Sequence, residues 1–251
     1  MLPDLASRSS MEELMDNPEC SEKLLLRTVR QFASINRMVA RYRLIFRRWI
    51  LPDMLREPQR SYHLLDMGAG GCDIDAWMLH AARKHGLNLR ITACDIDDRI
   101  LRYARSAYGH VDGLSIRKLD LLAARPGKAV DFVFANHFLH HLSSESILRL
   151  LDLWQAYVRL RMVFSDLERD RGSYLGYSAL ALFYRNSFAR YDGLLSIRRG
   201  FNPLELEALA RQALPGIAHQ VHRLRPGRLV LCVEGTDAGI PEFQKRLEPV
   251  I

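Results

Sequence analysis

The sequence has few of the features that define several common classes of protein. Its 251 residues include only four cysteines, at positions 20, 72, 94 and 232, and none forms a CxxC pair or a zinc-finger spacing. We therefore expect neither a disulfide framework nor a structural zinc site. A run of about 18 apolar residues is also missing, so no transmembrane helix is predicted. The N-terminus lacks a signal-peptide pattern, which favours a cytoplasmic protein with reduced thiols.

The overall composition is that of a globular chain. Apolar residues make up 48% and charged residues 26%, which excludes a disordered or low-complexity protein. Lysine and arginine number 36 against 29 acidic residues, which gives a formal net charge of +7. This charge is compatible with a nucleic acid, an anionic membrane or an acidic ligand, but it selects none of them.

The N-terminal part of the chain is predicted to form a helical cap over residues 1–58. Its first twenty residues are polar and rich in serine, and we expect them to be frayed. A single helix is predicted from Ser21 to Leu51, ended by Pro52 and Pro58, because apolar side chains recur at steps of three and four. These side chains are Val29, Phe32, Ile35, Val39, Tyr42, Phe46 and Trp49.

The other side of this predicted helix is basic, with arginines at 30, 37, 41 and 48 and no acid between Lys23 and Pro52. We interpret it as a solvated face. A helix at a membrane surface, which allows peripheral membrane contact, and a lid over an anionic group are the alternatives.

The rest of the chain alternates strands and helices. Strands are predicted at 62–67, 89–94, 114–117, 130–135, 161–164, 218–222 and 229–233, with helices at 74–85, 99–108, 143–159 and 203–213. This order predicts an α/β fold with a Rossmann-like, doubly wound, mainly parallel seven-stranded sheet over residues 59–251.

One stretch, residues 166–201, interrupts the alternation after the fifth strand. It is predicted to be a helical insertion on the substrate side, acting as a lid or binding wall, or else a helical pair that only packs on the N-terminal helix. It is rich in aromatic residues: Tyr174, Tyr177, Phe183, Tyr184, Phe188 and Tyr191. Together with Phe32, Tyr42, Phe46 and Trp49, these are expected to line an aromatic pocket.

The most informative segment is LLDMGAGGCDI, residues 64–74, in which a strand passes through a glycine turn into a helix. Such a turn indicates nucleotide binding. A dinucleotide GxGxxG pattern starting at Gly68 would need glycine at position 73, where this chain has Asp73. We expect Asp73 to cap the helix and to occupy the place of a pyrophosphate, which disfavours NAD and FAD. A P-loop pattern is also missing.

A nucleoside cofactor without phosphate fits the acidic residues better. Asp95 ends the second strand, where it can accept hydrogen bonds from both ribose hydroxyls, and Asp120 follows the third, where it can accept from an adenine amino group. Asp66 ends the first strand. With these residues the chain resembles the class I S-adenosylmethionine-dependent methyltransferases over roughly residues 60–235.

The resemblance implies S-adenosylmethionine as cofactor and a set of residues that bind it. Asp66, Gly68, Ala69 and Gly70 would cradle the methionine part, Asp95 and Ile96 the ribose, and Asp120 and Leu121 the adenine. Asn136, in the segment NHFLHHL, would face the methionine part. Cys72 stands where the family often has a third glycine, and its small side chain is expected to leave room for the cofactor.

The histidines of the same segment have three interpretations. His137, His140 and His141, with Asp166 from the next strand end, have the residue types of a metal site, but no metal is predicted. His140 or His141 is instead expected to be catalytic together with Asp166, because a neutral histidine there can take a proton from a phenol. A purely structural role remains the alternative.

The function expected from these patterns is methyl transfer to a small aromatic, phenolic or quinone-like acceptor. Residues 166–201 also resemble, more weakly, a bacterial subgroup that modifies small natural products. Arg198 and Arg199 are expected at the surface, or else as a clamp for a substrate carboxylate. An RNA methyltransferase, a non-catalytic cofactor-binding protein and a membrane-surface adaptor are the alternatives, and no nucleic acid is expected as partner.

Overall fold

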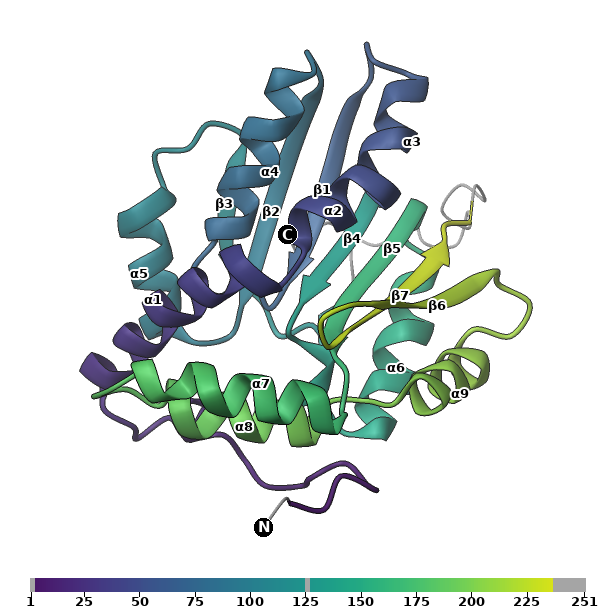
Figure 1. The fold of residues 1–251 in the computed structure, drawn as a ribbon. Helices are drawn as coiled ribbons and strands as arrows, with labels where there is room; N and C mark the ends of the chain where they lie inside the picture. Colours follow the sequence, from purple (N-terminus) through teal and green to yellow (C-terminus); the bar gives the residue numbers. More distant parts are fainter. Residues whose placement is uncertain (1–2, 125–126, 237–251) are drawn as a thin grey trace.

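A seven-stranded sheet forms the centre of the computed structural model, which describes residues 3–124 and 127–236 (Figure 1). The strands are β1 (Ser61–Met67), β2 (Asn88–Asp95), β3 (Leu114–Lys118), β4 (Val130–Asn136), β5 (Val158–Leu167), β6 (His219–Leu224) and β7 (Arg228–Glu234). Their order is β3-β2-β1-β4-β5-β7-β6. β1 to β5 are parallel, whereas β7 runs antiparallel to both β5 and β6. The predicted α/β fold is confirmed.

Helices cover both faces of the sheet because alternate strand residues point to opposite sides. Leu64 belongs to the core that the sheet forms with α3 (Leu51–Arg56) and α4 (Asp73–Lys84). Its neighbour Leu65 belongs to the opposite core, with α6 (Ser144–Gln155) and α9 (Pro203–Ala213). Near Ala93, α5 (Asp98–Tyr108) adds Ala104 to a smaller apolar cluster.

Two further helices, α7 (Arg171–Leu180) and α8 (Ala189–Arg199), lie side by side across the edge where the parallel strands end (Figure 1). They form the helical insertion predicted after β5. This insertion starts later than predicted, because β5 extends to Leu167 and therefore contains Asp166. The preceding helix is also shorter than predicted: α6 ends at Gln155, since Val158 already pairs with β4.

The N-terminal helix is not the single helix that the sequence predicts. α1 (Glu22–Val39) ends before Arg41, whose φ of +55° lies in the left-handed region. The chain continues as α2 (Tyr42–Ile45), a π-helical turn (Phe46–Ile50) and α3. Pro52 does not end this run, and it lies in the first turn of α3, a position that proline tolerates well.

The prediction of a frayed start is wrong for residues 3–20, and residues 1 and 2 lie outside the described part. Residues 3–20, called the N-terminal segment below, run beneath α8 (Figure 1). The N–H of Ser9 donates to the carbonyl of Arg198 at 3.0 Å, and the N–H of Leu14 donates to the Asp192 carboxylate at 2.8 Å. Composition alone suggested a tail because the partners lie more than 170 residues away.

The division into a cap (1–58) and a main domain (59–251) stays a prediction, and residues 237–251 lie outside the described part. Within the described ranges, no helix has the length and apolar character that crossing a bilayer requires.

The backbone of Arg41 provides a test of the helix break. Arg41→Gly should raise the free energy of unfolding by up to about 1 kcal/mol, since glycine adopts positive φ without strain. Arg37→Gly, in the interior of α1, should lower it by about 1 kcal/mol. Urea denaturation of both variants measures the two effects, and equal destabilisation by both would contradict the left-handed conformation.

Candidate active site

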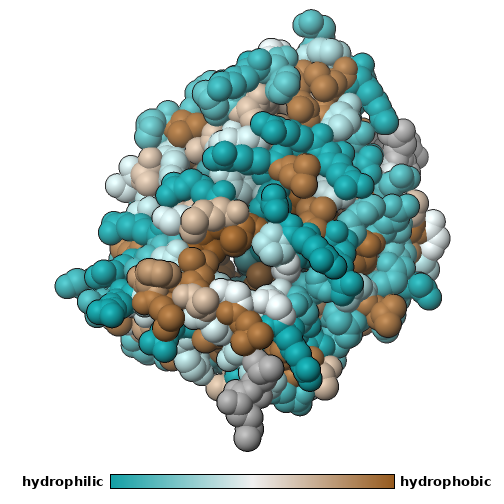
Figure 2. All heavy atoms as spheres, in the orientation of Figure 1, coloured by the Kyte–Doolittle hydropathy of each residue, from teal (hydrophilic) through white to brown (hydrophobic). Residues whose placement is uncertain are grey.

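A cavity of about 770 Å³ opens at the carboxyl edge of the parallel strands. Its walls come from the glycine turn after β1, the ends of β2 and β4, α1, α8 and the N-terminal segment. Figure 2 shows this face hollowed, with apolar side chains around the hollow, between the places that α1 and α7 occupy in Figure 1. The position agrees with the rule that ligands of open α/β sheets bind beyond the strand ends.

The glycine turn brings the backbone against the cavity. Gly68 has a φ of +69°, and a Cβ built on it would lie 2.5 Å from the ring of Phe138. Gly70 has a φ of +55°, and its N–H donates to Asp95 Oδ2 at 3.0 Å. Cys72 takes the next left-handed position, with a φ of +61°, and is buried beside Ala93 outside the cavity lining. Its side chain leaves the cavity free, as the sequence predicts.

Asp66 and Asp95, at the ends of β1 and β2, have carboxylate oxygens that are available to a ligand with a positive charge and hydroxyl groups. Asp66 is 3% exposed, and among the described residues its Oδ1 has no hydrogen-bond partner. Burial, reinforced by the neighbouring Asp75, holds the pKa of Asp66 well above its usual range, so a cation placed there would be stabilising. Asp95 accepts from Gly70 and from the N–H of Asp97, also at 3.0 Å. Each of its oxygens retains a lone pair for a further donor.

The other residues predicted to bind the cofactor lie on the same cavity. Ile96 is 62% exposed at its rim, and Asp120 is exposed and accepts from the N–H of Leu122. Asn136 accepts a hydrogen bond from the buried Arg228. All nine predicted positions line this one cavity: Asp66, Gly68, Ala69, Gly70, Asp95, Ile96, Asp120, Leu121 and Asn136. Their contacts with a cofactor are part of the proposal below.

The predicted role of Asp73 as a helix cap is wrong. Cys72 is the N-cap of α4, and Asp73 is the first helical residue, without a side-chain capping bond. Its carboxylate lines the cavity, and burial raises its pKa to about 6. The capping preference of aspartate belongs to the N-cap position, which Cys72 holds here.

His140 is held in a buried pair with Asp166. The histidine is 2% exposed, its Nδ1 lies 2.6 Å from Asp166 Oδ1, and its backbone N–H donates to Asp166 Oδ2 at 3.1 Å. Burial alone would lower the pKa of His140, but Asp166 and Glu13 outweigh it and raise it to about 9. Burial alone would raise the pKa of Asp166, and His140 instead holds it well below its usual range. Asp166 lies behind His140 and does not line the cavity.

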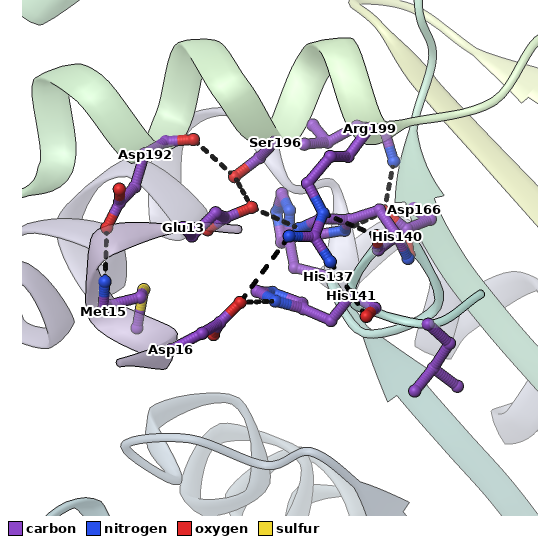
Figure 3. Close-up of polar contacts among 12 residues, drawn as sticks. Glu13, Met15, Asp16, His137, His140, His141, Asp166, Asp192, Ser196 and Arg199 are labelled. Atoms are coloured by element: carbon purple, nitrogen blue, oxygen red, sulfur yellow. Dashed lines mark hydrogen bonds and ion pairs between the residues drawn. The ribbon is translucent and has the colours of Figure 1, made fainter. Parts of the chain in front are cut away.

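The N-terminal segment contributes two acids that the sequence analysis missed. Glu13 Oε1 lies 3.5 Å from His140 Nε2 and accepts a hydrogen bond from Ser196 Oγ at 2.8 Å (Figure 3). Asp16 Oδ2 lies 3.0 Å from Nδ1 of His141. Both acids were missed because they lie in a polar stretch without periodicity, which the sequence analysis interprets as a frayed tail.

The arginines near the end of the insertion do not form the predicted surface pair, and their role as a clamp for a substrate carboxylate stays a prediction. Arg199 is buried and donates to three backbone carbonyls, those of Met11, His140 and His141, at 2.8 to 3.0 Å. Arg198 is partly buried. The guanidinium of Arg199 therefore ties the N-terminal segment to the turn that carries His140.

The predicted aromatic pocket is only partly present. Phe32 and Tyr177 line the cavity, and so does Phe138, which was not predicted. Tyr42, Phe46 and Trp49 are buried in the core beside α4 instead. In the insertion, Phe183 is 82% exposed and Tyr191 is 44% exposed. The helical spacing of these aromatics is a packing signal, and it does not distinguish a core from a pocket wall.

The histidines also come close enough together to form two sets with the donor types of a metal site. The possible ligand atoms of Glu13, His140 and His141 lie within 4.8 Å of one another, as do those of His137, His140 and Asp166. His140 belongs to both sets, and each of its ring nitrogens faces a carboxylate.

Part of the chain matches a known family, and its fold matches solved structures. Residues 65–157 match the family model described as a methyltransferase domain. No curated protein sequence matches the chain. Among solved structures, the S-adenosylmethionine-dependent methyltransferase SibL is 18% identical with a TM-score of 0.60, over 90% of this chain and 63% of that one. Human N-acetylserotonin methyltransferase in complex with SAM is 16% identical with a TM-score of 0.60, over 86% and 57%.

A third structure shares the same fold. The plantazolicin methyltransferase BpumL, in complex with a triazolic desmethylPZN analog and SAH, is 10% identical with a TM-score of 0.63, over 84% of this chain and 91% of that one. The chain spans 63% and 57% of the first two structures, and at these identities the likeness shows the fold. Residues 65–157 therefore match a methyltransferase domain, and the fold of the chain is the one that these three methyltransferase structures share.

The raised pKa of His140 predicts a pH dependence of stability. A histidine whose folded pKa lies above its unfolded value of about 6.5 stabilises the fold fully below that value, and the contribution is lost as pH rises through about 9. The free energy of unfolding should therefore fall between pH 7 and 9.5, and in His140→Gln this fall should be smaller by a few kcal/mol. Urea titrations at both pH values measure it.

His110→Gln is the matched control, because His110 is exposed. This variant should keep the wild-type slope. An unchanged slope in His140→Gln would show that other groups, such as the buried thiols, account for the whole effect.

Proposed function

We propose that the protein transfers a methyl group from S-adenosylmethionine to a hydroxyl oxygen of a small, neutral, phenolic or quinone-like molecule. The observation that carries this proposal is the His140–Asp166 pair at the wall of the cavity that the glycine turn and Asp95 also line. A histidine backed by a carboxylate has the arrangement of a general base. The partial aromatic lining by Phe32, Phe138 and Tyr177 suits a planar ring.

The cavity supports a neutral acceptor better than an anionic one. Eight carboxylates and one arginine line it, and that arginine, Arg199, is engaged by three backbone carbonyls. A phosphate or carboxylate on the acceptor would find no free guanidinium among the described lining residues, and it would face like charges. Hydroxyl groups, which donate hydrogen bonds, suit carboxylate partners.

Several structures with the same fold belong to methyltransferases or biosynthetic proteins whose names refer to small molecules. They include N-acetylserotonin methyltransferase, the plantazolicin methyltransferase and the pyocyanin biosynthetic protein PhzM. These names describe those proteins. Together with the cavity, they support a small-molecule acceptor for this chain over RNA.

The roles of the chain's own residues follow from their positions. S-adenosylmethionine would supply an activated methyl group on a sulfonium. Asp66 would face the cationic methionine part, Asp95 would accept from the ribose, and Asp120 would lie by the adenine. His140 would take the acceptor proton at Nε2 while Asp166 holds the ring at Nδ1. α8 and the N-terminal segment would exclude water from the methyl transfer.

Asp95 provides the test of the cofactor site. In Asp95→Ala the ribose hydroxyls lose a charged acceptor worth about 1.5–3 kcal/mol, so affinity for adenosylhomocysteine should fall about tenfold to a hundredfold. Calorimetry on the folded variant measures this change. Asp98→Ala, an exposed neighbour that does not line the cavity, should bind like the wild type. Wild-type affinity in Asp95→Ala would remove Asp95 from the site.

His140 provides the test of the reaction. With a set of neutral phenols and quinols and methyl-labelled cofactor, the wild type should form methyl ethers. His140→Ala should slow transfer by roughly 10²–10⁴-fold while adenosylhomocysteine binding is retained. Carboxylated phenols and tRNA complete the set. Transfer to tRNA alone, or an undiminished rate in His140→Ala, would argue against the proposal, and no transfer by a cofactor-binding wild type would favour a non-catalytic protein.

A further inference from the structure

The acceptor site contains an obstacle to the proposed reaction. Nδ1 of His140 is bonded to Asp166, so Nε2 is the only ring atom that can take the acceptor proton. Glu13 Oε1 lies 3.5 Å from that atom (Figure 3). An acceptor hydroxyl within hydrogen-bond reach of Nε2 would have to enter the space that the Glu13 carboxylate now holds.

We propose that Glu13 is a gate of the acceptor site: its carboxylate occupies the position at His140 Nε2 that the acceptor hydroxyl takes, and acceptor binding exchanges one for the other. The inference rests on the proposed function. It assigns a positioning role to the N-terminal segment, which is far from the methyltransferase motifs in sequence.

The contact distances show which contact is exchangeable. Asp166 is 2.6 Å from His140, a short charged hydrogen bond, whereas the 3.5 Å between Glu13 and Nε2 is at the limit of one. The tighter partner of Glu13 is Ser196, at 2.8 Å. Glu13 faces His140 mainly through charge. Moving Oε1 away from Nε2 also gives up the Ser196 contact, but the Ser196 hydroxyl has a second acceptor at 2.8 Å, the carbonyl of Asp192, so it keeps a hydrogen bond when Glu13 leaves.

The backbone around Glu13 is fixed, which confines the exchange to its side chain. The N–H groups of Leu14 and Met15 donate to Asp192 at 2.8 and 3.0 Å. On the other side, the carbonyl of Met11 accepts from Arg199 at 2.8 Å. With both flanks held, a rotation of the Glu13 side chain opens Nε2 and leaves the segment in place.

The charges around His140 explain why Glu13 occupies the position at Nε2 when no acceptor is bound. With Glu13 in place the imidazole is flanked by two carboxylates and is protonated at neutral pH. Two further histidines, His141 and His137, pack their rings on the imidazole, and Asp16 contacts His141. Two arginines, Arg8 and Arg199, donate to the backbone carbonyl of His140. Of the carboxylates, Asp166 and Glu13 contact the ring itself.

The proposed cycle balances in atoms and charge. When Glu13 rotates away, the Nε2 proton leaves to solvent and the acceptor hydroxyl donates to the free Nε2. His140 then takes the hydroxyl proton as the O–CH₃ bond forms and the S–CH₃ bond breaks, which turns adenosylmethionine into adenosylhomocysteine. The imidazolium formed in this step attracts Glu13 back, and the methyl ether, which has no proton to donate to Nε2, is released.

The first experiment needs no acceptor. Side-chain NMR titration of His140 in the wild type, Glu13→Gln and Glu13→Ala should show its pKa falling by at least one unit in both variants, because a carboxylate that favours the imidazolium is lost. Ser196→Ala, which frees Glu13 from α8, should give a smaller fall. Glu19→Gln, an exposed acid of the same segment, is the control and should titrate like the wild type.

The second experiment tests the exchange, with phenol as probe in the presence of adenosylhomocysteine. Glu13→Ala should bind phenol several-fold more tightly than the wild type, and the bound phenol should shift the His140 signals. Weaker phenol binding in Glu13→Ala would show that Glu13 recognises the acceptor and does not compete with it, which overturns the gate. An unchanged His140 titration in both Glu13 variants overturns it as well.

The two proposals fail in different ways. If Glu13 controls the His140 titration and the phenol affinity but neither the wild type nor Glu13→Ala methylates any phenol, the gate stands and the reaction proposed above falls. Equilibrium dialysis with Zn²⁺ tests the remaining explanation, which is that Glu13 and the histidines bind a metal ion. Micromolar binding that is lost in Glu13→Ala would replace the gate with a metal site on Glu13, His140 and His141.

Discussion

The buried pair of His140 and Asp166 is the interaction on which the rest of the site depends. It joins the turn after β4 to the end of β5, and removing one partner of such a pair costs about 3–5 kcal/mol because a charge is left buried. The carbonyl of His140 in turn accepts from Arg199 on α8 and from Arg8 on the N-terminal segment. The two elements that enclose the His140 side of the cavity therefore converge on one turn, and the position of that turn is set by the pair.

The parts of the site that lie on the parallel strands could be predicted from the sequence. Parallel strands place their carboxyl ends at one edge, so Asp66, Asp95 and Asn136, each at the end of its strand, were bound to meet there. The glycine turn required positive φ at Gly68 and Gly70, and the backbone adopts it. The apolar pattern of each strand and the order of strands along the chain were sufficient for these residues, because the position of each residue depends only on its own strand.

The surroundings of His140 and His141 could not be predicted, because they are built from contacts between residues that are distant in the sequence. Glu13 meets Ser196 across 183 positions, and Asp16 meets His141 across 125. A polar, serine-rich stretch has no periodicity that would reveal such contacts, and it resembles a solvated tail. The aromatic residues predicted on the next helix misled in the opposite way. Tyr42, Phe46 and Trp49 fill the core, and of these four aromatic residues Phe32 alone lines the cavity.

The net charge of the chain and the charge of its cavity have opposite signs. The protein carries a formal charge of +7, yet the cavity is lined by eight carboxylates and a single arginine. Bulk charge acts over the outer surface and is screened within about 10 Å, whereas a charge buried in a cavity is screened much less. The acids therefore dominate what the cavity selects. Under the proposed function, they would favour a sulfonium over the neutral thioether that remains after methyl transfer, and this difference would help the spent cofactor to leave.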